Sequence, residues 1–314
     1  YDFTDELSAF VRVGTDFITH EIRSVNQYGH WFYPTGQFSY STRSSTETNA
    51  DFLMKYNDSF GSFNISANAG GNMRYDTYRY YGIWGEDFKI PEKPIISSAS
   101  TVDPGRTPLR EKEVHSLYGS ATIDYRSMVY LDVSGRNDWS SALPEDERSY
   151  FYPSASLSFL FNEIFNINNS WLSYSKLRAS WAQVGKDTEP YQLTNAFNLA
   201  DERSSYLGRT ILSRPGTYYT DIKPEMTNSL EFGADFRFFN NRLYAEAAYY
   251  DISSTNLIMR VPVPAATGYS QYNTNVGEIS NEGYEFTLGG QPVKGGNFLW
   301  DVSVNVAHNE NTLV

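Results

Sequence analysis

The chain of 314 residues contains no cysteine, which excludes a disulfide framework and any cysteine-ligated metal site. No apolar run approaches the roughly 18 residues that a membrane-spanning helix requires. Basic residues are also few, because 25 Lys and Arg stand against 37 Asp and Glu, which gives a net charge of −12. No Lys or Arg cluster is dense enough to follow a phosphate backbone, so a nucleic-acid partner is excluded as well.

Aromatic residues, by contrast, are abundant. The chain has 25 Tyr, 20 Phe and 6 Trp, more than the core of a soluble domain needs. Transmembrane β-barrels place such rings in belts at the two membrane interfaces. An apolar share of 40% and a mean hydropathy of −0.50 also suit ordinary soluble domains. Composition therefore leaves two alternatives, a soluble protein and one that crosses the membrane as strands.

Alternation of apolar and polar residues with period two favours strands. In the clearest segment, residues 230–238, apolar side chains occupy every second position and polar or small residues the positions between. Residues 243–250 repeat this pattern after the short connection 239–242, which predicts a hairpin. The segments 117–125, 154–161 and 300–306 alternate in the same way. Their polar positions hold mainly Ser, Asn, Asp and Thr, which a water-filled lumen tolerates and a packed core does not.

The connections between the expected strands alternate between short and long. We expect strands near 3–22, 49–57, 61–76, 115–125, 128–138, 151–161, 172–185, 227–238, 242–255, 277–289 and 297–309. Short connections at 57–60, 126–127, 162–171, 239–241 and 290–296 alternate with long ones at 23–48, 77–114, 139–150, 186–226 and 256–276. Outer-membrane barrels use short periplasmic turns and long external loops, so this pattern predicts an all-β, antiparallel transmembrane barrel. An odd number of strands is unusual for a single-chain bacterial barrel, so we expect further strands elsewhere.

Several short motifs in the second half of the chain occur in a characteristic order. They are 131–141 (LDVSGRNDWSS), 152–159 (YPSASLSF), 177–185 (LRASWAQVG), 223–225 (KPE) leading into 230–235 (LEFGAD), 238–243 (FFNNRL), 261–264 (VPVP) with 268–269 (GY), 275–279 (NVGEI) and 281–285 (NEGYE). From about residue 115 to the end, and more loosely before it, this ordered set resembles the barrel of SusC/RagA-type TonB-dependent transporters.

The resemblance implies a 22-stranded barrel in the outer membrane of a Gram-negative cell, with residues 1–314 forming roughly half of that one domain. It also implies a plug domain, coupling to the TonB-ExbB-ExbD complex and a SusD-like surface lipoprotein, none of which lies in this sequence. The family, found chiefly in Bacteroidetes, imports oligosaccharides or peptides. We therefore expect energy-coupled import of a glycan or a peptide. A passive porin and, as a weaker alternative, a soluble secreted glycan-binding β-protein are the rival interpretations.

The sequence predicts no enzyme, no cofactor and no metal site. The four histidines lie far apart without metal-ligand spacing. No G-x-S-x-G nucleophile elbow is present. The carboxylate run 145–147 falls in an expected loop, where a solvated charge run is the simpler interpretation. Asp201 and Glu202 offer oxygen ligands for calcium, but without the spacing of an EF-hand loop.

Two sets of residues are candidates for contact with a solute. The long loops carry aromatic rings that can stack on sugars or on peptide side chains. These are Trp31, Tyr33, Tyr80, Tyr81, Trp84, Trp139, Tyr218 and Tyr219. The polar positions of the strands supply the candidate lumen-facing residues Glu231, Asp235, Arg237, Glu246, Asp301 and Asn305. Packing of loops against one another, and networks that hold the wall together, are the alternative roles of these two sets.

Overall fold

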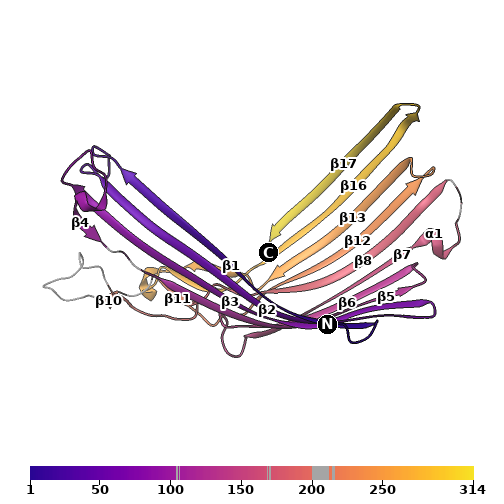
Figure 1. Ribbon diagram of the computed structural model, residues 1–314, viewed down its shortest axis with the longest axis horizontal. Coiled ribbons are helices and arrows are strands. Elements are labelled where there is room, and N and C mark those ends of the chain that lie inside the picture. The colour runs from indigo at the N-terminus through magenta and orange to yellow at the C-terminus, as the bar shows by residue number, and fades with distance from the viewer. Residues whose placement is uncertain (104, 106, 168, 170, 200–211, 214–215) are drawn as a thin grey trace. The chain divides into compact units, whose positions relative to one another are not determined.

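The protein is built almost entirely from long β-strands (Figure 1). The computed structural model describes residues 1–314 except 104, 106, 168, 170, 200–211 and 214–215. The long strands are β1 (Leu7–Asn26), β2 (Gln37–Phe60), β3 (Phe63–Phe88), β5 (Leu109–Tyr125), β6 (Val129–Ser140), β7 (Ser149–Leu160), β8 (Leu172–Lys186), β12 (Glu225–Phe238), β13 (Leu243–Thr255), β16 (Glu278–Gly295) and β17 (Phe298–Leu313).

Shorter elements lie in the connections between the long strands. They are β4 (Ala99–Asp103), β9 (Asn198–Leu199), β10 (Leu212–Ser213), β11 (Thr217–Tyr219), β14 (Ile258–Pro262), β15 (Gln271–Asn275), the helix α1 (Phe161–Ile164) and the 3-10 turns Ile96–Ser98 and Ala265–Thr267. No helix of the described residues is long and apolar enough to cross a membrane.

The long strands are hydrogen-bonded in the order in which they follow one another along the chain. The sheet runs β1-β2-β3-β5-β6-β7-β8-β12-β13-β16-β17, and β4 pairs with β3 beside this path. The chain divides into two compact units. The first unit comprises residues 1–10, 52–71 and 115–314, and the second comprises residues 11–51 and 72–114. The predicted all-β fold and the eleven long strands are confirmed among the described residues.

Two of the predicted loops are wrong in extent. The structure starts β2 at residue 37 and continues β3 to residue 88, so the expected loop 23–48 shrinks to 27–36. The expected loop 77–114 likewise shrinks to 89–108 and contains β4. The sequence of these extensions is rich in Ser, Thr and Tyr and lacks an apolar face, so its alternation is weak. Ladder hydrogen bonds sustain a strand there without an apolar face. The predicted short connection 290–296 also shrinks, to 296–297, because β16 continues to Gly295.

Apolar side chains share one face of the sheet in the first unit. The registers align Val129, Phe159, Leu177, Ala234, Ala247, Phe286 and Val306 in one row across seven strands, and Leu131, Leu157, Ala179, Phe232, Tyr249 and Tyr284 in the next row. These side chains remain open to solvent, with Phe232 48% and Phe286 43% exposed. A continuous exposed apolar face of this size is what a membrane-facing wall requires.

Four of the five short connections are tight turns, and the fifth, between β7 and β8, contains α1. The turn from β12 to β13 places Phe239, Asn240 and Asn241 in the left-handed region, with φ of 53°, 55° and 64°. The backbone N–H of Arg242 closes it by donating to the carbonyl oxygen of Phe238 at 3.0 Å. Between β7 and β8, Asn162 and Ser175 bind each other's backbone N–H groups through their side chains at 2.9 and 3.0 Å. These contacts fix the strand ends from which the registers start.

A charge on the apolar face should cost much more than the same charge on the polar face. We expect Phe232→Arg to destabilise the membrane-inserted protein by about 2–4 kcal/mol, because this residue lies near the middle of the apolar belt. Glu246→Arg, on the opposite face of the adjacent strand, serves as the matched control and should change stability by less than about 1 kcal/mol. Equilibrium unfolding in lipid vesicles measures both values. Equal losses for the two variants would contradict the assignment of the faces.

Candidate functional site

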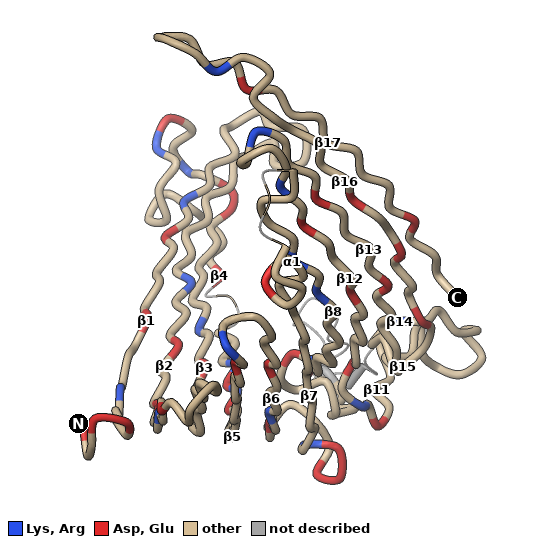
Figure 2. The backbone as a smooth tube through the Cα atoms, turned by 90° about the vertical axis from the view of Figure 1, so that its right-hand side faces the viewer, with Lys and Arg blue, Asp and Glu red and all other residues tan. Residues whose placement is uncertain are grey.

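The polar face of the first unit lies opposite the apolar face and is the candidate lining of a solute path. Its central row contains Tyr130, Ser158, Arg178, Gly233, Ala248, Glu285 and Ala307. A neighbouring row contains Lys176, Asp235, Glu246, Thr287 and Asn305. Asp and Glu residues recur along β12, β13 and β16 in Figure 2. The polar face therefore carries charge where the opposite face carries aliphatic and aromatic side chains.

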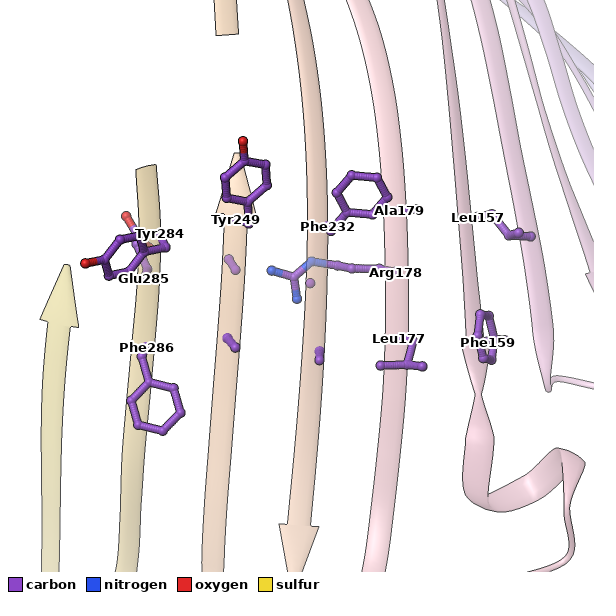
Figure 3. Close-up of a pocket in the computed structure, with 14 residues that line it drawn as sticks. Leu157, Phe159, Leu177, Arg178, Ala179, Phe232, Tyr249, Tyr284, Glu285 and Phe286 are labelled. Atoms are coloured by element: carbon purple, nitrogen blue, oxygen red, sulfur yellow. The ribbon is translucent and has the colours of Figure 1, made fainter. Parts of the chain in front are cut away.

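Arg178 is the centre of the best-connected charged cluster on this face. Its Nη1 lies 3.1 Å from Oδ2 of Asp235, and its Nη2 lies 3.3 Å from Oε1 of Glu231. Figure 3 shows the guanidinium extending from β8 across β12. The carboxylates stand two residues either side of Gly233 on β12, so one cation bridges two anions. The group as a whole keeps one negative charge.

Gly233 provides the space in which this arginine lies. A Cβ atom built on Gly233 would overlap Cζ and Nε of Arg178 and would stand 2.8 Å from its Cγ. Real Cβ contacts do not occur at such distances, so any larger residue would displace the guanidinium. The sequence LEFGADF thus alternates apolar residues with a glycine flanked by two carboxylates, and it forms a seat for an arginine of the neighbouring strand.

All six predicted lumen-facing residues alternate along their strands with the residues of the apolar rows, which places them on the polar face. Glu231 and Asp235 join the Arg178 cluster. The guanidinium of Arg237 lies 5.3 Å from the ring centroid of Tyr174. The remaining three form no ion pair with described residues: Asp301 accepts from Gln291 at 3.3 Å, Asn305 accepts from Thr287 at 2.8 Å, and Glu246 stands opposite Asp235 and Thr287.

The aromatic candidates in the second unit do not all lie in loops, and that part of the prediction is wrong. Trp31, 86% exposed, and Tyr33, which stacks on His30 at 5.7 Å, lie in the connection 27–36. Tyr80, Tyr81 and Trp84 lie in β3 instead. The strand reaches residue 88 because its ladder continues past the segment with clear alternation. These three rings therefore project from a wall and not from a loop.

The aromatic candidates in the first unit also lie in strands. Trp139 is next to the last residue of β6, and Tyr218 and Tyr219 form most of β11. Tyr218 belongs to a cluster that the sequence did not indicate. Its ring centroid lies 5.0 Å from that of Tyr269 and 5.4 Å from that of Tyr272. The parallel pairing of β11 with β15 brings these rings together, and no local signal in the sequence could have revealed that pairing.

A small buried core holds several of the long loops against the strand ends. Leu143 and Ile222 are fully buried and cluster with Tyr150, and Leu193 and Ile258 pack against this cluster. A polar network borders it. There, the Asp138 carboxylate accepts hydrogen bonds from Nε of Arg136 and from the hydroxyl of Tyr152, both at 2.7 Å. The loops at this end are thereby packed on the strand ends from which they emerge.

No group of three or more His, Asp or Glu residues in the described part of the chain could hold a metal ion. Asp201 and Glu202, which the sequence offered as oxygen ligands for calcium, lie outside the described residues. The polar face presents charged and hydrogen-bonding groups, which are able to contact a polar solute.

Comparison with known proteins assigns this two-faced sheet to a family. Residues 1–312 match the family model described as TonB dependent receptor-like, beta-barrel. The chain belongs to this TonB-dependent receptor family. Its short turns therefore lie on the periplasmic side of the outer membrane and its long loops outside, and its apolar face is the lipid-facing surface.

Two relatives of this TonB-dependent receptor barrel show how much of a longer protein it matches. The TonB-dependent receptor P3 of Formosa agariphila is 27% identical over 296 residues, which is 89% of this chain and 28% of the relative. The TonB-dependent receptor SusC of Bacteroides thetaiotaomicron is 27% identical over 227 residues, which is 68% of this chain and 23% of the relative. The chain therefore spans about a quarter of the length of these curated relatives.

Solved structures show the same fold. The RagAB peptide transporter matches 99% of this chain and 35% of its own, with a TM-score of 0.86 and 20% sequence identity. The copper transporter OprC matches 98% of this chain and 45% of its own with a TM-score of 0.61. At such identities these likenesses show the barrel fold alone. The SusC/RagA-type resemblance expected from the sequence motifs is confirmed.

Adding a side chain at Gly233 should release Arg178 from its two carboxylates. We expect Gly233→Ala to destabilise the protein by about 0.5–1.5 kcal/mol, a modest value because the three charged groups are partly exposed. In an Arg178→Ala background the same change should cost less, because the clash and both ion pairs are already gone. Gly295→Ala, whose Cβ would meet nothing within 4 Å, is the control. Equilibrium unfolding in detergent micelles measures the four values, and additive losses would contradict the proposed seat.

Proposed function

We propose that the full-length protein imports oligosaccharides or peptides across the outer membrane with energy supplied through TonB. The observation that carries this proposal is a barrel wall of the TonB-dependent receptor family whose polar face is lined with charged and hydrogen-bonding groups. SusC and the RagAB peptide transporter, by their names a TonB-dependent receptor and a peptide transporter, support the same class of activity. The protein would move its solute without making or breaking a covalent bond, and so is no enzyme.

The described strands would form one part of a single barrel domain. In the sheet order, β1 and β17 each have one hydrogen-bonded neighbour. An unpaired strand edge costs several kcal/mol for each backbone group in lipid, so both edges need further strands as partners. We propose that residues 1–314 supply about half of a barrel of roughly 22 strands, and that other segments of the full-length protein supply the rest and a plug.

Two partners follow from the resemblance to SusC/RagA-type transporters. A SusD-like surface lipoprotein would cover the external mouth, and the TonB-ExbB-ExbD complex would move the plug from the periplasmic side. The long loops offer a packed external surface for the first partner, because the core around Leu143 and Ile222 holds them in place. Outer-membrane lipid would cover the apolar face.

Within this proposal, those aromatic candidates whose rings face the solute path contact the solute first. The cluster of Tyr218, Tyr269 and Tyr272 presents three rings and three hydroxyl groups on the sheet formed by β11, β14 and β15. Ring faces stack on sugars or on apolar peptide side chains, and the hydroxyls bond polar groups. The polar face, with the Arg178 cluster, would line the route below. A passive porin is the second candidate function, because its wall would show the same two faces.

Dependence on TonB distinguishes the importer from the porin. We expect a strain that lacks the gene to lose growth on one glycan or peptide class, and TonB deletion to abolish growth on it equally. Uptake that survives loss of TonB would leave the porin as the better interpretation.

Tyr218→Ala should weaken solute binding about 3–10-fold, the equivalent of one aromatic contact. Tyr28→Ala, at an exposed tyrosine outside the cluster, is the control in equilibrium binding measurements.

A further inference from the structure

One hollow on the lipid-facing surface has a cation, Arg242, at its edge. It has a volume of about 610 Å³ and lies beside the β12–β13 turn, where β13 begins and where β16 and β17 continue past that turn toward their own hairpin. Its apolar walls come from the lipid-facing rows of these strands: Leu243, Leu288, Val302 and Val304. Arg242 and Phe239, from the turn between β12 and β13, complete the rim.

Gly290 keeps this hollow open. It pairs with Leu243 on one side and Val302 on the other, so a side chain there would project from the lipid-facing surface into the hollow. A Cβ atom at this position would stand 2.6 Å from the carbonyl oxygen of Arg242 and 3.4 Å from Cδ1 of Leu243. The register of β16 against β17 shifts directly after this residue, between Gly290 and Val293. The missing side chain and the bulge leave a recess in an otherwise continuous apolar wall.

Arg242 is held in position but not neutralised. Its Nη2 donates to the carbonyl oxygens of Gln291 and Pro292, both at 3.3 Å, and its own carbonyl accepts from the N–H of Gln291 at 2.8 Å. These bonds tie the turn after β12 to the hairpin of β16 and β17. Among the described residues, no carboxylate forms an ion pair with Arg242. No acceptor among them is hydrogen-bonded to its Nε or Nη1. Arg178, Arg136, Arg12 and Arg74 all have carboxylate partners.

Another hollow on this surface serves for comparison, because it is one that bulk lipid can fill. It has a volume of about 660 Å³ and lies among Leu157, Phe159, Ala179, Phe232 and Phe286 (Figure 3). Its apolar row carries no cation, because Arg178 alternates with that row and bonds to carboxylates on the polar face. Hydrocarbon chains fill such a hollow without selectivity. The hollow beside Arg242 combines apolar walls with a positive charge that a short turn holds at its edge.

We propose that this hollow binds one glycerophospholipid of the periplasmic leaflet. An acyl chain lies against Leu288, Val302 and Val304, and the lipid phosphate accepts hydrogen bonds from the free guanidinium edge of Arg242. A guanidinium matches phosphate well, since it offers two parallel N–H donors. The exposed ring of Phe239 stands beside it at the interface, where aromatic side chains of barrels reside. The bound lipid bridges the β12–β13 turn to the β16–β17 hairpin, whatever solute the barrel carries.

The test measures how much phospholipid the full-length protein retains. The protein is purified in a mild detergent, exchanged into lipid-free micelles and titrated with phosphatidylglycerol, with native mass spectrometry counting bound lipids. We expect one tightly retained phosphatidylglycerol, and Arg242→Gln should weaken its binding about tenfold, as the loss of a charge-assisted contact predicts. Arg126→Gln is the matched control. Arg126 is another exposed cation at a short turn, but it bonds to Ser62 and lies over Tyr125.

Two further measurements distinguish binding of the whole phospholipid from binding of its acyl chains or its phosphate alone. Val302→Phe fills the hollow with an apolar ring and leaves Arg242 in place, so it should weaken phosphatidylglycerol binding while the barrel keeps its heat-modifiable mobility on gels. Diacylglycerol, which lacks the phosphate, should bind without any effect of Arg242→Gln. Equal retention of phosphatidylglycerol by wild type and Arg242→Gln would overturn the proposal. Displacement of the lipid by inorganic phosphate at the same concentration would also overturn it, because it would show an anion site without a lipid site.

Discussion

Backbone hydrogen bonding in lipid is the constraint on which the rest of this structure depends. Inside a bilayer no water is present to pair with an N–H or C=O group, so a strand can cross only when both neighbours bond to it. The order of the sheet follows from this requirement, because each long strand pairs with the long strand that precedes it in sequence. The tight turns follow as well. Three successive left-handed residues at Phe239–Asn241 return the chain directly onto its own ladder.

The register of that ladder determines the chemistry of both surfaces. Since side chains alternate with period two, a slip of one residue would move every apolar side chain to the lumen and every charge into lipid. Arg178, Glu231 and Asp235 meet only in the observed register of β8 against β12, where Gly233 lies opposite Arg178. The ion pairs are individually weak, because all three groups are partly exposed. Together with the glycine seat they distinguish this register from its neighbours.

The sequence correctly predicts those strands in which apolar and polar residues alternate regularly between the two faces. The hairpin of β12 and β13 was predicted within two residues of its bounds, because apolar and polar positions alternate there without a break. Arg178 could have been placed on the polar face by the same alternation. Its partners could not, since they lie 53 and 57 residues away. The cluster of Tyr218 with Tyr272 likewise depends on a pairing between β11 and β15 that no local pattern encodes.

The lengths of β2 and β3 explain why the predicted bounds of two long loops are wrong. They also limit which aromatic candidates can contact the same solute. A tilted strand crosses the hydrocarbon with about 9–11 residues, whereas β2 has 24 and β3 has 26, so most of each lies outside the hydrocarbon. In that part no apolar face is required, and alternation fades although pairing continues. A strand also fixes the directions in which its side chains project, whereas a loop does not. Tyr80 and Trp84 project from one face of β3 and Tyr81 from the other. Only one face can line a solute path, so these three rings cannot all contact the same solute.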